Sequence, residues 1–249
     1  MCKLKSAIIL KDRIFMPDYD SHSDMLTELG IKDDYLGASK KFVRAEFSPA
    51  DGDVFSPVDG WVFKVDQDIT PEWFSEEEYK PRMLEAVKEW AKTHIHIGIT
   101  GLKIDSGCNH YIKDCNDVEV CGNATVNEVY GNATVNEVYG NATVNKVCGN
   151  ATVKWVSENA TVNKVCGNAT VNEVYGNATV KWVSENATVK WVSENATVAS
   201  SAYTKWNNAG SLILSDNSTF KDNYGKVIYQ SGDYKLISVE SGKAIGEAK

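Results

Sequence analysis

Histidines and cysteines able to bind a metal gather near the middle of the chain. His94 and His96 form a His-x-His pair, and Cys108, His110 and Cys115 follow shortly afterwards. Imidazole and thiolate groups at this density are typical zinc ligands. The spacing lacks the Cys-x-x-Cys pair of a zinc knuckle, and the run His-Ile-His-Ile also fits a strand with its histidines facing solvent. We therefore predict no metal centre, and the four positions that could form one are His94, His96, Cys108 and His110.

Acidic side chains in the first part of the chain could act as acids, bases or metal ligands. Asp18 and Asp20 lie two residues apart, as do Asp66 and Asp68. Carboxylates transfer protons only when a reacting group lies within reach, and no nucleophile or base accompanies these in the sequence. The chain also contains no phosphate-binding glycine loop, no Gly-x-Ser-x-Gly and no His-Glu-x-x-His. We predict a protein that is not an enzyme and holds no cofactor; bound metal, or a deep pocket lined by Asp18, Asp20 or His22, would indicate an enzyme.

A run of near-identical nonapeptides determines the architecture of the second half of the chain. The tetrad Asn-Ala-Thr-Val begins at Asn123 and recurs every nine residues as far as Asn195. A short fixed period of this kind is typical of a solenoid. Two valines, such as Val126 and Val129, never vary as far as Val192, so we predict that they form the core. The alanine shares their face and the threonine points outward. Asparagine and glycine occupy the turn, because both tolerate a left-handed backbone.

Nine residues are too few to close one coil, whereas two repeats close one comfortably. The sequence therefore predicts a mainly β protein, a β-solenoid of about 18 residues per coil whose strands stack about 4.8 Å apart. Degenerate repeats flank the regular ones, among them Asn217-Ser-Thr-Phe220, so we place the solenoid at residues 93–229. Residues 230–249 then form a strand-rich C-terminal cap.

Residues 1–92 contain no repeat and are predicted to form a small acidic α+β domain. Alternating apolar residues predict three strands, at residues 5–15, 42–47 and 61–65. In the second of these strands, Arg44 and Glu46 alternate with apolar residues and are placed on the polar face. Asp-Gly pairs supply turns between the strands.

Two helices are predicted in this domain. A serine cap followed three residues later by an acid places the start of the first at Ser21. A helical stretch opens at Thr70-Pro71, and a second start at Pro81 begins an amphipathic helix that ends near His94. Because a solenoid must cover the open end of its core, we predict that this last helix caps it.

The repeats differ from one another in three linked cassettes, Asn-Glu-Val-Tyr-Gly, Asn-Lys-Val-Cys-Gly and Lys-Trp-Val-Ser-Glu. With two repeats per coil, the residue before the second valine forms two columns, Glu128, Lys146, Lys164, Trp182 and Glu137, Trp155, Glu173, Trp191. Duplication of whole units accounts for the cassettes, but exposed tryptophan typically marks a contact site. If these side chains are exposed, a partner binds at Lys154, Trp155, Lys181, Trp182, Lys190 and Trp191. If they pack against neighbouring coils, they are structural.

Charge and cysteine content limit the partners and the compartment. The chain has a net charge of −8, and residues 1–92 hold thirteen basic and nineteen acidic residues. Because nucleic-acid phosphates demand a basic surface, we predict no direct binding of DNA or RNA, and a protein partner that is basic or itself binds nucleic acid. No apolar segment suits a signal peptide or a membrane span, so we expect a cytoplasmic protein of a bacterial cell that binds no membrane. Its six cysteines are then thiols, although Cys148 and Cys166 would stack within disulfide range.

The repeat Gly-Asn-Ala-Thr-Val-Asn-Glu-Val-Tyr follows two characteristic segments, Phe42-Val-Arg-Ala-Glu-Phe47 and Val65-Asp-Gln-Asp68. In this combination the chain resembles uncharacterised nonapeptide-repeat β-solenoid proteins of gut bacteria and their phages. The resemblance implies a phage-associated or mobile-element context and no particular function. Repeat solenoids in that context act by binding, as inhibitors of host proteins, as scaffolds or as virion parts.

We therefore predict a non-enzymatic protein that binds another macromolecule, with a phage-encoded inhibitor of a bacterial defence protein as the concrete form. The alternative is a structural scaffold that assembles into homo-oligomers. A third hypothesis is ice binding, because a threonine in every repeat resembles the flat threonine arrays of ice-binding solenoids. Lys154, Lys181 and Lys190 interrupt that array.

Overall fold

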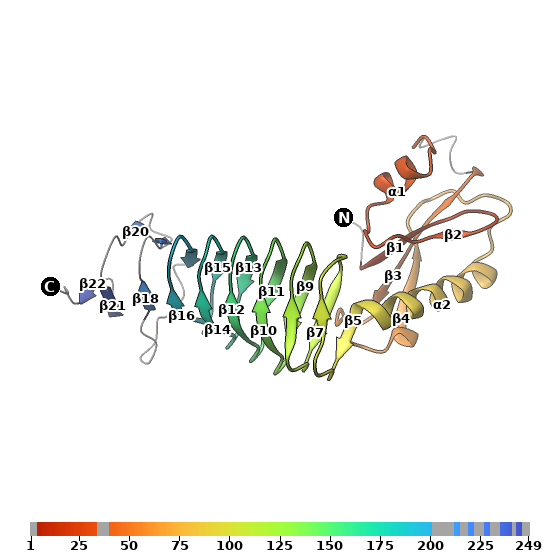
Figure 1. Cartoon of the computed structure of the whole chain (residues 1–249). Coiled ribbons are helices and arrows are strands. Elements are labelled where there is room, and N and C mark those ends of the chain that lie inside the picture. The colour runs from red at the N-terminus through yellow and green to blue at the C-terminus, as the bar shows by residue number, and fades with distance from the viewer. Residues whose placement is uncertain are drawn as a thin grey trace. The chain divides into compact units, whose positions relative to one another are not determined.

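The computed structural model describes residues 4–33 and 40–200. Beyond these it describes the backbone of five strands, at residues 212–214, 219–221, 227–229, 235–240 and 243–245. The chain divides into two compact units, Met1–Ile95 and His96–Lys249, hereafter the first and the second unit (Figure 1).

A four-stranded antiparallel sheet in the order β2-β1-β3-β4 forms the centre of the first unit. Its strands are β1 (Lys5–Ile9), β2 (Ile14–Phe15), β3 (Val43–Pro49) and β4 (Trp61–Val65). The single strand predicted at residues 5–15 is wrong, because the chain reverses between β1 and β2. There the Leu10 amide donates to the Arg13 carbonyl at 2.8 Å. The charged Lys11 and Asp12 remain exposed in that turn, where a continued central strand would bury them.

Two helices pack on opposite faces of this sheet. The α1 helix (His22–Glu28) starts where predicted, since the Ser21 hydroxyl accepts a hydrogen bond from the Asp24 amide. It contributes Met25 and Leu26 to a core around Ile8 of β1. The α2 helix (Glu76–His94) stacks Trp90 against the Lys5 ammonium, which is 5.2 Å from the ring centre. Neighbouring residues of a strand point to opposite faces, and Lys5 and Ile8 differ by an odd number, so the helices lie on opposite sides.

The predicted helix start at Pro81 is wrong, because α2 runs without interruption from Glu76 and contains Pro81. The apolar stripe predicted for it is present, with Met83, Val87 and Trp90 buried. Its role as a cap on the solenoid stays a prediction.

The second unit is a β-solenoid built of two parallel stacks of strands (Figure 1). One sheet has the order β22-β21-β18-β16-β14-β12-β10-β8-β6, and the other β20-β19-β17-β15-β13-β11-β9-β7-β5. The strands of the first half are β5 (Ile95–Ile97), β6 (Lys103–Ile104), β7 (His110–Lys113), β8 (Val118–Val120), β9 (Thr125–Tyr130), β10 (Thr134–Val138), β11 (Thr143–Val147), β12 (Thr152–Val156) and β13 (Thr161–Val165). Those of the second half are β14 (Thr170–Val174), β15 (Thr179–Val183), β16 (Thr188–Val192), β17 (Thr197–Ser200), β18 (Leu212–Leu214), β19 (Thr219–Lys221), β20 (Val227–Tyr229), β21 (Lys235–Glu240) and β22 (Lys243–Ile245).

Successive strands alternate between the two sheets, so one coil contains two nonapeptides. Thr134 of β10 accordingly pairs with Thr152 of β12, one coil later. This confirms the predicted solenoid of about 18 residues per coil. The alanine and both valines of every repeat from Ala124 to Val183 are fully buried between the sheets, which confirms the predicted core.

The two core valines of a repeat stand three residues apart, a spacing that a flat strand would place on opposite faces. The strand pairing shows how both reach the core. Val135 pairs with Val153 and Glu137 with Trp155, while the residue after the first valine is left out of the register. Each strand therefore departs from regular alternation at this residue, and two consecutive side chains point outward between two inward valines.

The turn between repeats depends on one left-handed residue, which is glycine in most repeats. Three repeats place a glutamate there, and Glu158, Glu185 and Glu194 have φ angles of 55°, 60° and 56°. The asparagine that follows is not left-handed, so the explanation predicted for it is wrong. Instead its side-chain amide donates to the asparagine one coil earlier, as Asn159 does to Asn141 at 3.4 Å. The constant asparagine is thus explained by a hydrogen-bonded ladder along the solenoid.

The three turn glutamates offset their backbone cost with a hydrogen bond to the preceding coil. The Glu185 carboxylate accepts from the Gly167 amide at 2.8 Å, and Glu158 and Glu194 accept from Gly140 and Gly176 in the same way. A left-handed non-glycine residue costs about 1–2 kcal/mol, similar to the value of a charged hydrogen bond.

We therefore expect Glu185→Ala to lower the free energy of unfolding by about 1 kcal/mol, because it keeps the backbone cost and loses the acceptor. Glu185→Gly should leave that free energy within about 0.5 kcal/mol of the wild type, because relief of the backbone offsets the lost bond. Urea denaturation of both variants measures the difference. A Glu185→Ala variant that is as stable as the wild type would show that the carboxylate contributes nothing.

Cys148 and Cys166 form a disulfide, so the prediction that all cysteines are thiols is wrong for this pair. They occupy the same position on adjacent coils, where stacking brings their Cα atoms to 4.8 Å, inside the range of a disulfide. Cys121 holds the same position within its repeat but belongs to the other sheet, so it lies over Tyr139. The buried Cys115 and Cys121 are not in disulfides.

Parallel stacking continues beyond the regular repeats. Thr219 and Phe220 of β19 pair with Thr197 and Val198, which confirms that this segment continues the stack; Asn217 and Ser218 lie outside the described residues. The strands after that pair in the antiparallel sense, β20 with β19 and β21 with β18. The parallel stack thus ends at β18 and β19.

Candidate functional site

Two neighbouring outward columns run along each sheet of the solenoid, formed by the two residues between the valines. The pairs Glu137–Trp155, Trp155–Glu173 and Glu173–Trp191 stand opposite one another on successive coils of one sheet. Lys146 stands opposite Lys164 on the other sheet. These registers confirm the two columns that the repeat spacing predicts.

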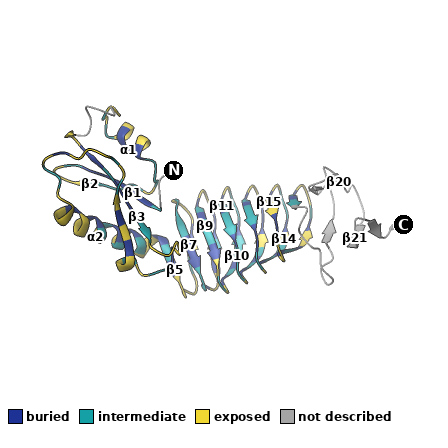
Figure 2. Cartoon of the chain, turned by 180° about the vertical axis from the view of Figure 1, so that it is seen from behind, coloured by how far each residue is buried: buried dark blue, intermediate teal, exposed yellow. Residues whose placement is uncertain are grey.

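Tryptophans in these columns are exposed. The exposed fractions are 39% for Trp155, 44% for Trp182 and 37% for Trp191. Exposed positions within the strands are concentrated in the later coils of the regular repeats (Figure 2). The tryptophans thus meet the condition of exposure under which the repeat pattern predicts a contact site.

Each tryptophan follows a lysine in the adjacent column. In the described part of the chain, Lys154, Lys181 and Lys190 have no ion-pair partner, whereas Lys146 pairs with Glu128 one coil earlier at 2.7 Å. The lysines also break the polar ladder of that column. In the corresponding column of the other sheet, Asn145 donates to Asn127 at 2.9 Å, whereas Asn172 lies between the coils of Lys154 and Lys190 and its Oδ1 has no hydrogen-bond partner.

The six predicted contact residues do not form one surface. Lys154, Trp155, Lys190 and Trp191 lie on β12 and β16, in one sheet with β14 between them. Lys181 and Trp182 lie on β15, in the other sheet. Because the valine core separates the sheets, the two sets face away from each other. We call the outward side of β12, β14 and β16 the tryptophan face.

On the tryptophan face, the two indoles are separated by one intervening coil. Trp155 and Trp191 each stand opposite Glu173, so they lie two strand spacings apart, about 10 Å along the solenoid. Lys154 and Lys190 repeat at the same spacing beside them. The half-buried threonine column flanks the lysine column. The face thus alternates aromatic with acidic groups in one column, and cationic with amide groups in the next.

The four metal candidates from the sequence lie in different units, His94 in the first and His96, Cys108 and His110 in the second. His96 and His110 stack on each other, with 3.4 Å between His96 Nε2 and His110 Nδ1. His94 is engaged elsewhere, since its Nδ1 lies 2.9 Å from the Trp90 carbonyl oxygen and its Nε2 lies 3.3 Å from Asp18. Cys108 is half-buried. Through its two contacts, His94 packs at the end of α2.

The acidic residues of the first unit take separate roles. Asp20 forms an ion pair with the fully buried Lys5 at 2.9 Å and also accepts from the Ser6 amide. Burial raises the pKa of the Asp20 carboxyl, against the opposing effect of Lys5. Asp66 and Asp68 are both exposed, and Asp66 lies 3.7 Å from His22. Asp20 and Asp18 thus contact different side chains, Lys5 and His94.

Among the described residues, one group of histidine, cysteine or acidic side chains has the geometry to hold a metal: His22, Glu46 and Asp66. The three residues are far apart in the sequence, and strand alternation places Glu46 on a polar face, so their spacing does not predict this group. That face is covered, and Glu46 is only 3% exposed. Strand alternation alone gives no sign of which polar face a helix will cover.

Indole and ammonium groups exposed on a sheet can bind other molecules by aromatic packing and cation–π contact. Neither helix in the described ranges has the length and apolar character needed to cross a bilayer.

No protein-family model, no curated protein and no solved structure matches this chain.

Proposed function

We propose that the protein binds another protein through the tryptophan face, without catalysing a reaction. The observation that supports this proposal is the exposure of Trp155 and Trp191 on one sheet, each beside a lysine that has no ion-pair partner in the described part of the chain. Tryptophan is among the residues that contribute most to binding energy at protein interfaces.

The solenoid itself does not need these tryptophans. Glu137 and Glu173 hold the same column on neighbouring coils, with the same backbone pairing and the same buried valines. A side chain that the core does not require, and that leaves a large apolar area in water, is more readily explained by a contact with a partner.

The charge pattern of the face fits a partner with both acidic and basic groups at its contact surface. Lys154 and Lys190 in one column share the face with Glu173 in the next, so a partner with a single sign of charge would meet like charges. The resemblance to proteins of gut bacteria and their phages makes a bacterial protein the natural partner. The concrete form of the proposal is a phage or mobile-element inhibitor of a bacterial defence protein.

The test replaces both tryptophans of the face by the residue that their column already contains. We expect Trp155→Glu with Trp191→Glu to weaken partner binding by at least about 30-fold, equivalent to the 2 kcal/mol that defines a hot spot. The partner is first captured from bacterial lysate and identified by mass spectrometry, and its affinity is then measured with purified proteins. Trp182→Lys is the matched control, because Lys146 and Lys164 hold that column and Trp182 lies on the other sheet.

Equal loss in the control would mean that exposed tryptophan acts non-specifically. A partner retained by the double variant would move the binding site away from this face. If no partner is captured and the size of the protein rises with its concentration, the scaffold alternative replaces the proposal.

A further inference from the structure

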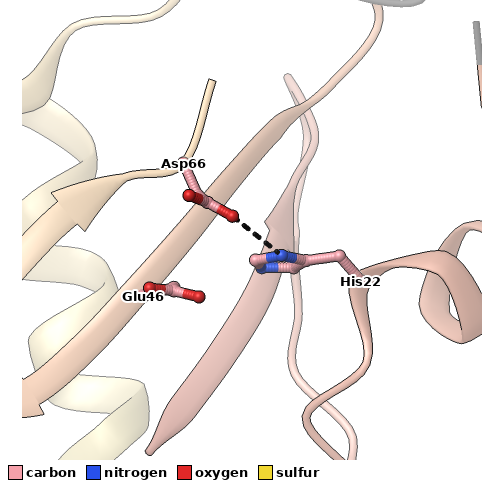
Figure 3. A group of neighbouring side chains, drawn as sticks. All are labelled: His22, Glu46 and Asp66. Carbon is pink, nitrogen blue, oxygen red and sulfur yellow. Dashed lines mark ion pairs between the residues drawn. The ribbon is translucent and has the colours of Figure 1, made fainter. Parts of the chain in front are cut away.

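Three side chains from separate segments of the first unit converge beside its sheet (Figure 3). His22 is the first residue of α1, Glu46 lies in β3, and Asp66 directly follows β4. One imidazole nitrogen and one oxygen of each carboxylate all lie within 4.8 Å of one another. His22 and Glu46 are buried, whereas Asp66 is exposed, so the group opens to solvent on one side.

The hydrogen bonding of His22 determines which nitrogen faces the carboxylates. Its Nε2 lies 3.3 Å from the Ala45 carbonyl oxygen, which can only accept, so Nε2 carries the proton and donates. The other nitrogen, Nδ1, lies 3.7 Å from an oxygen of Asp66. In this tautomer Nδ1 presents a lone pair to the carboxylates, an arrangement that a cation stabilises.

The separation of these atoms fits a metal ion better than a shared proton. A gap of 3.7 Å between Nδ1 and the Asp66 oxygen exceeds the length of a hydrogen bond. A tetrahedral zinc ion with bonds of about 2.0–2.1 Å separates its ligand atoms by about 3.3 Å. A small movement of the exposed Asp66 side chain would therefore bring this pair of atoms to the separation of two zinc ligands.

The charged neighbour of Asp66 lies at the carboxylate oxygen that is turned away from His22. Lys64 donates to the Asp66 oxygen Oδ1 at 3.3 Å, whereas the atom nearest His22 is Oδ2. Lys64 is itself exposed and free to move into solvent. Glu46 is flanked in the sheet by Ser6 and Lys64, and a carboxylate buried this deeply is favoured by a nearby cation.

We propose that His22, Glu46 and Asp66 bind one divalent transition-metal ion, with zinc as the ion that their chemistry favours. One imidazole and two carboxylates are borderline ligands of the kind that zinc accepts, whereas calcium and magnesium prefer oxygen ligands alone. Three protein ligands leave one position for water on the open side. Bound there, zinc would connect α1 to two strands of the sheet. This inference does not depend on the tryptophan face.

The experiment measures zinc binding to the intact chain by competition with a chromophoric chelator, after metal has been removed. We expect one zinc ion per chain in the wild type. Asp66→Asn should weaken its affinity by more than about tenfold, since even the loss of an outer-sphere partner has that effect. Asp66 is exposed, so this variant should fold. Asp68→Asn, two residues further on and also exposed, is the matched control and should bind zinc as the wild type does.

A second variant distinguishes the proposed site from the stacked His96–His110 pair. If His110→Ala abolishes zinc binding and Asp66→Asn does not, zinc binds in the second unit and the proposal is wrong. If the wild type binds no zinc at millimolar concentration, the proposal is also wrong. Cobalt(II) provides an independent check. The intense visible absorption of a tetrahedral site should be present in the wild type and weakened in Asp66→Asn.

Discussion

Replacing Asp20 by asparagine is expected to lower the free energy of unfolding of the first unit by about 3 kcal/mol or more. Asp20 is the partner of Lys5, whose side chain has no exposed surface. Lys5 also donates to the Pro17 carbonyl at 2.6 Å and lies over the Trp90 ring, but neither group carries a compensating charge. Removal of the carboxylate therefore leaves a buried ammonium without a counter-charge, which is among the most costly changes in a protein interior.

The double variant Lys5→Met with Asp20→Asn separates the charge effect from packing. Methionine has a similar length and keeps the contact with Trp90, so most of the lost stability should return. Hydrogen exchange of the β1 amides in the intact chain reports the first unit separately from the solenoid. A loss below about 1 kcal/mol in the single variant, or no recovery in the double variant, would contradict this account of Lys5.

Loss of the Cys148–Cys166 disulfide is expected to lower the stability of the solenoid by about 3 kcal/mol, the value of the chain-entropy model for a loop of this length. The two cysteines are 18 residues apart, one coil of the solenoid. Serine already holds this position at Ser184 in the next coil of the same column, so Cys148→Ser with Cys166→Ser removes the cross-link with little change in packing. The quantity to measure is the urea midpoint of the solenoid, with and without reductant.

Reductant sensitivity provides the control for this prediction. The midpoint of the wild type should fall when dithiothreitol is added, and the double serine variant should show no response. Cys121→Ser should keep the full response, because Cys121 is not in a disulfide. If both Cys148 and Cys166 are alkylated in the unreduced, unfolded wild type, the bond does not form in solution and the sensitivity will be absent.

The repeat sequence determined most of what is now known about the second unit. A nine-residue period with constant alanine and valine can satisfy its core only by stacking, so the coil length, the buried positions and the outward columns follow from local spacing alone. The strand at 61–65 and the cap at Ser21 were predictable for the same reason, since each depends on neighbouring residues. In contrast, the turn at Lys11 was missed because the apolar residues on either side of it also fit one strand.

Only the tertiary structure decided which of these residues act together. The spacing already separates Trp182 from Trp155 and Trp191 and stacks Cys148 on Cys166. It does not show that the tryptophans are exposed or that the two cysteines form a disulfide. Glu46 reads as a surface residue in its strand, yet the packing of α1 buries it beside His22 and Asp66. The physical reason is that periodicity reports the environment along one segment, whereas a site forms between segments that meet only when the chain packs.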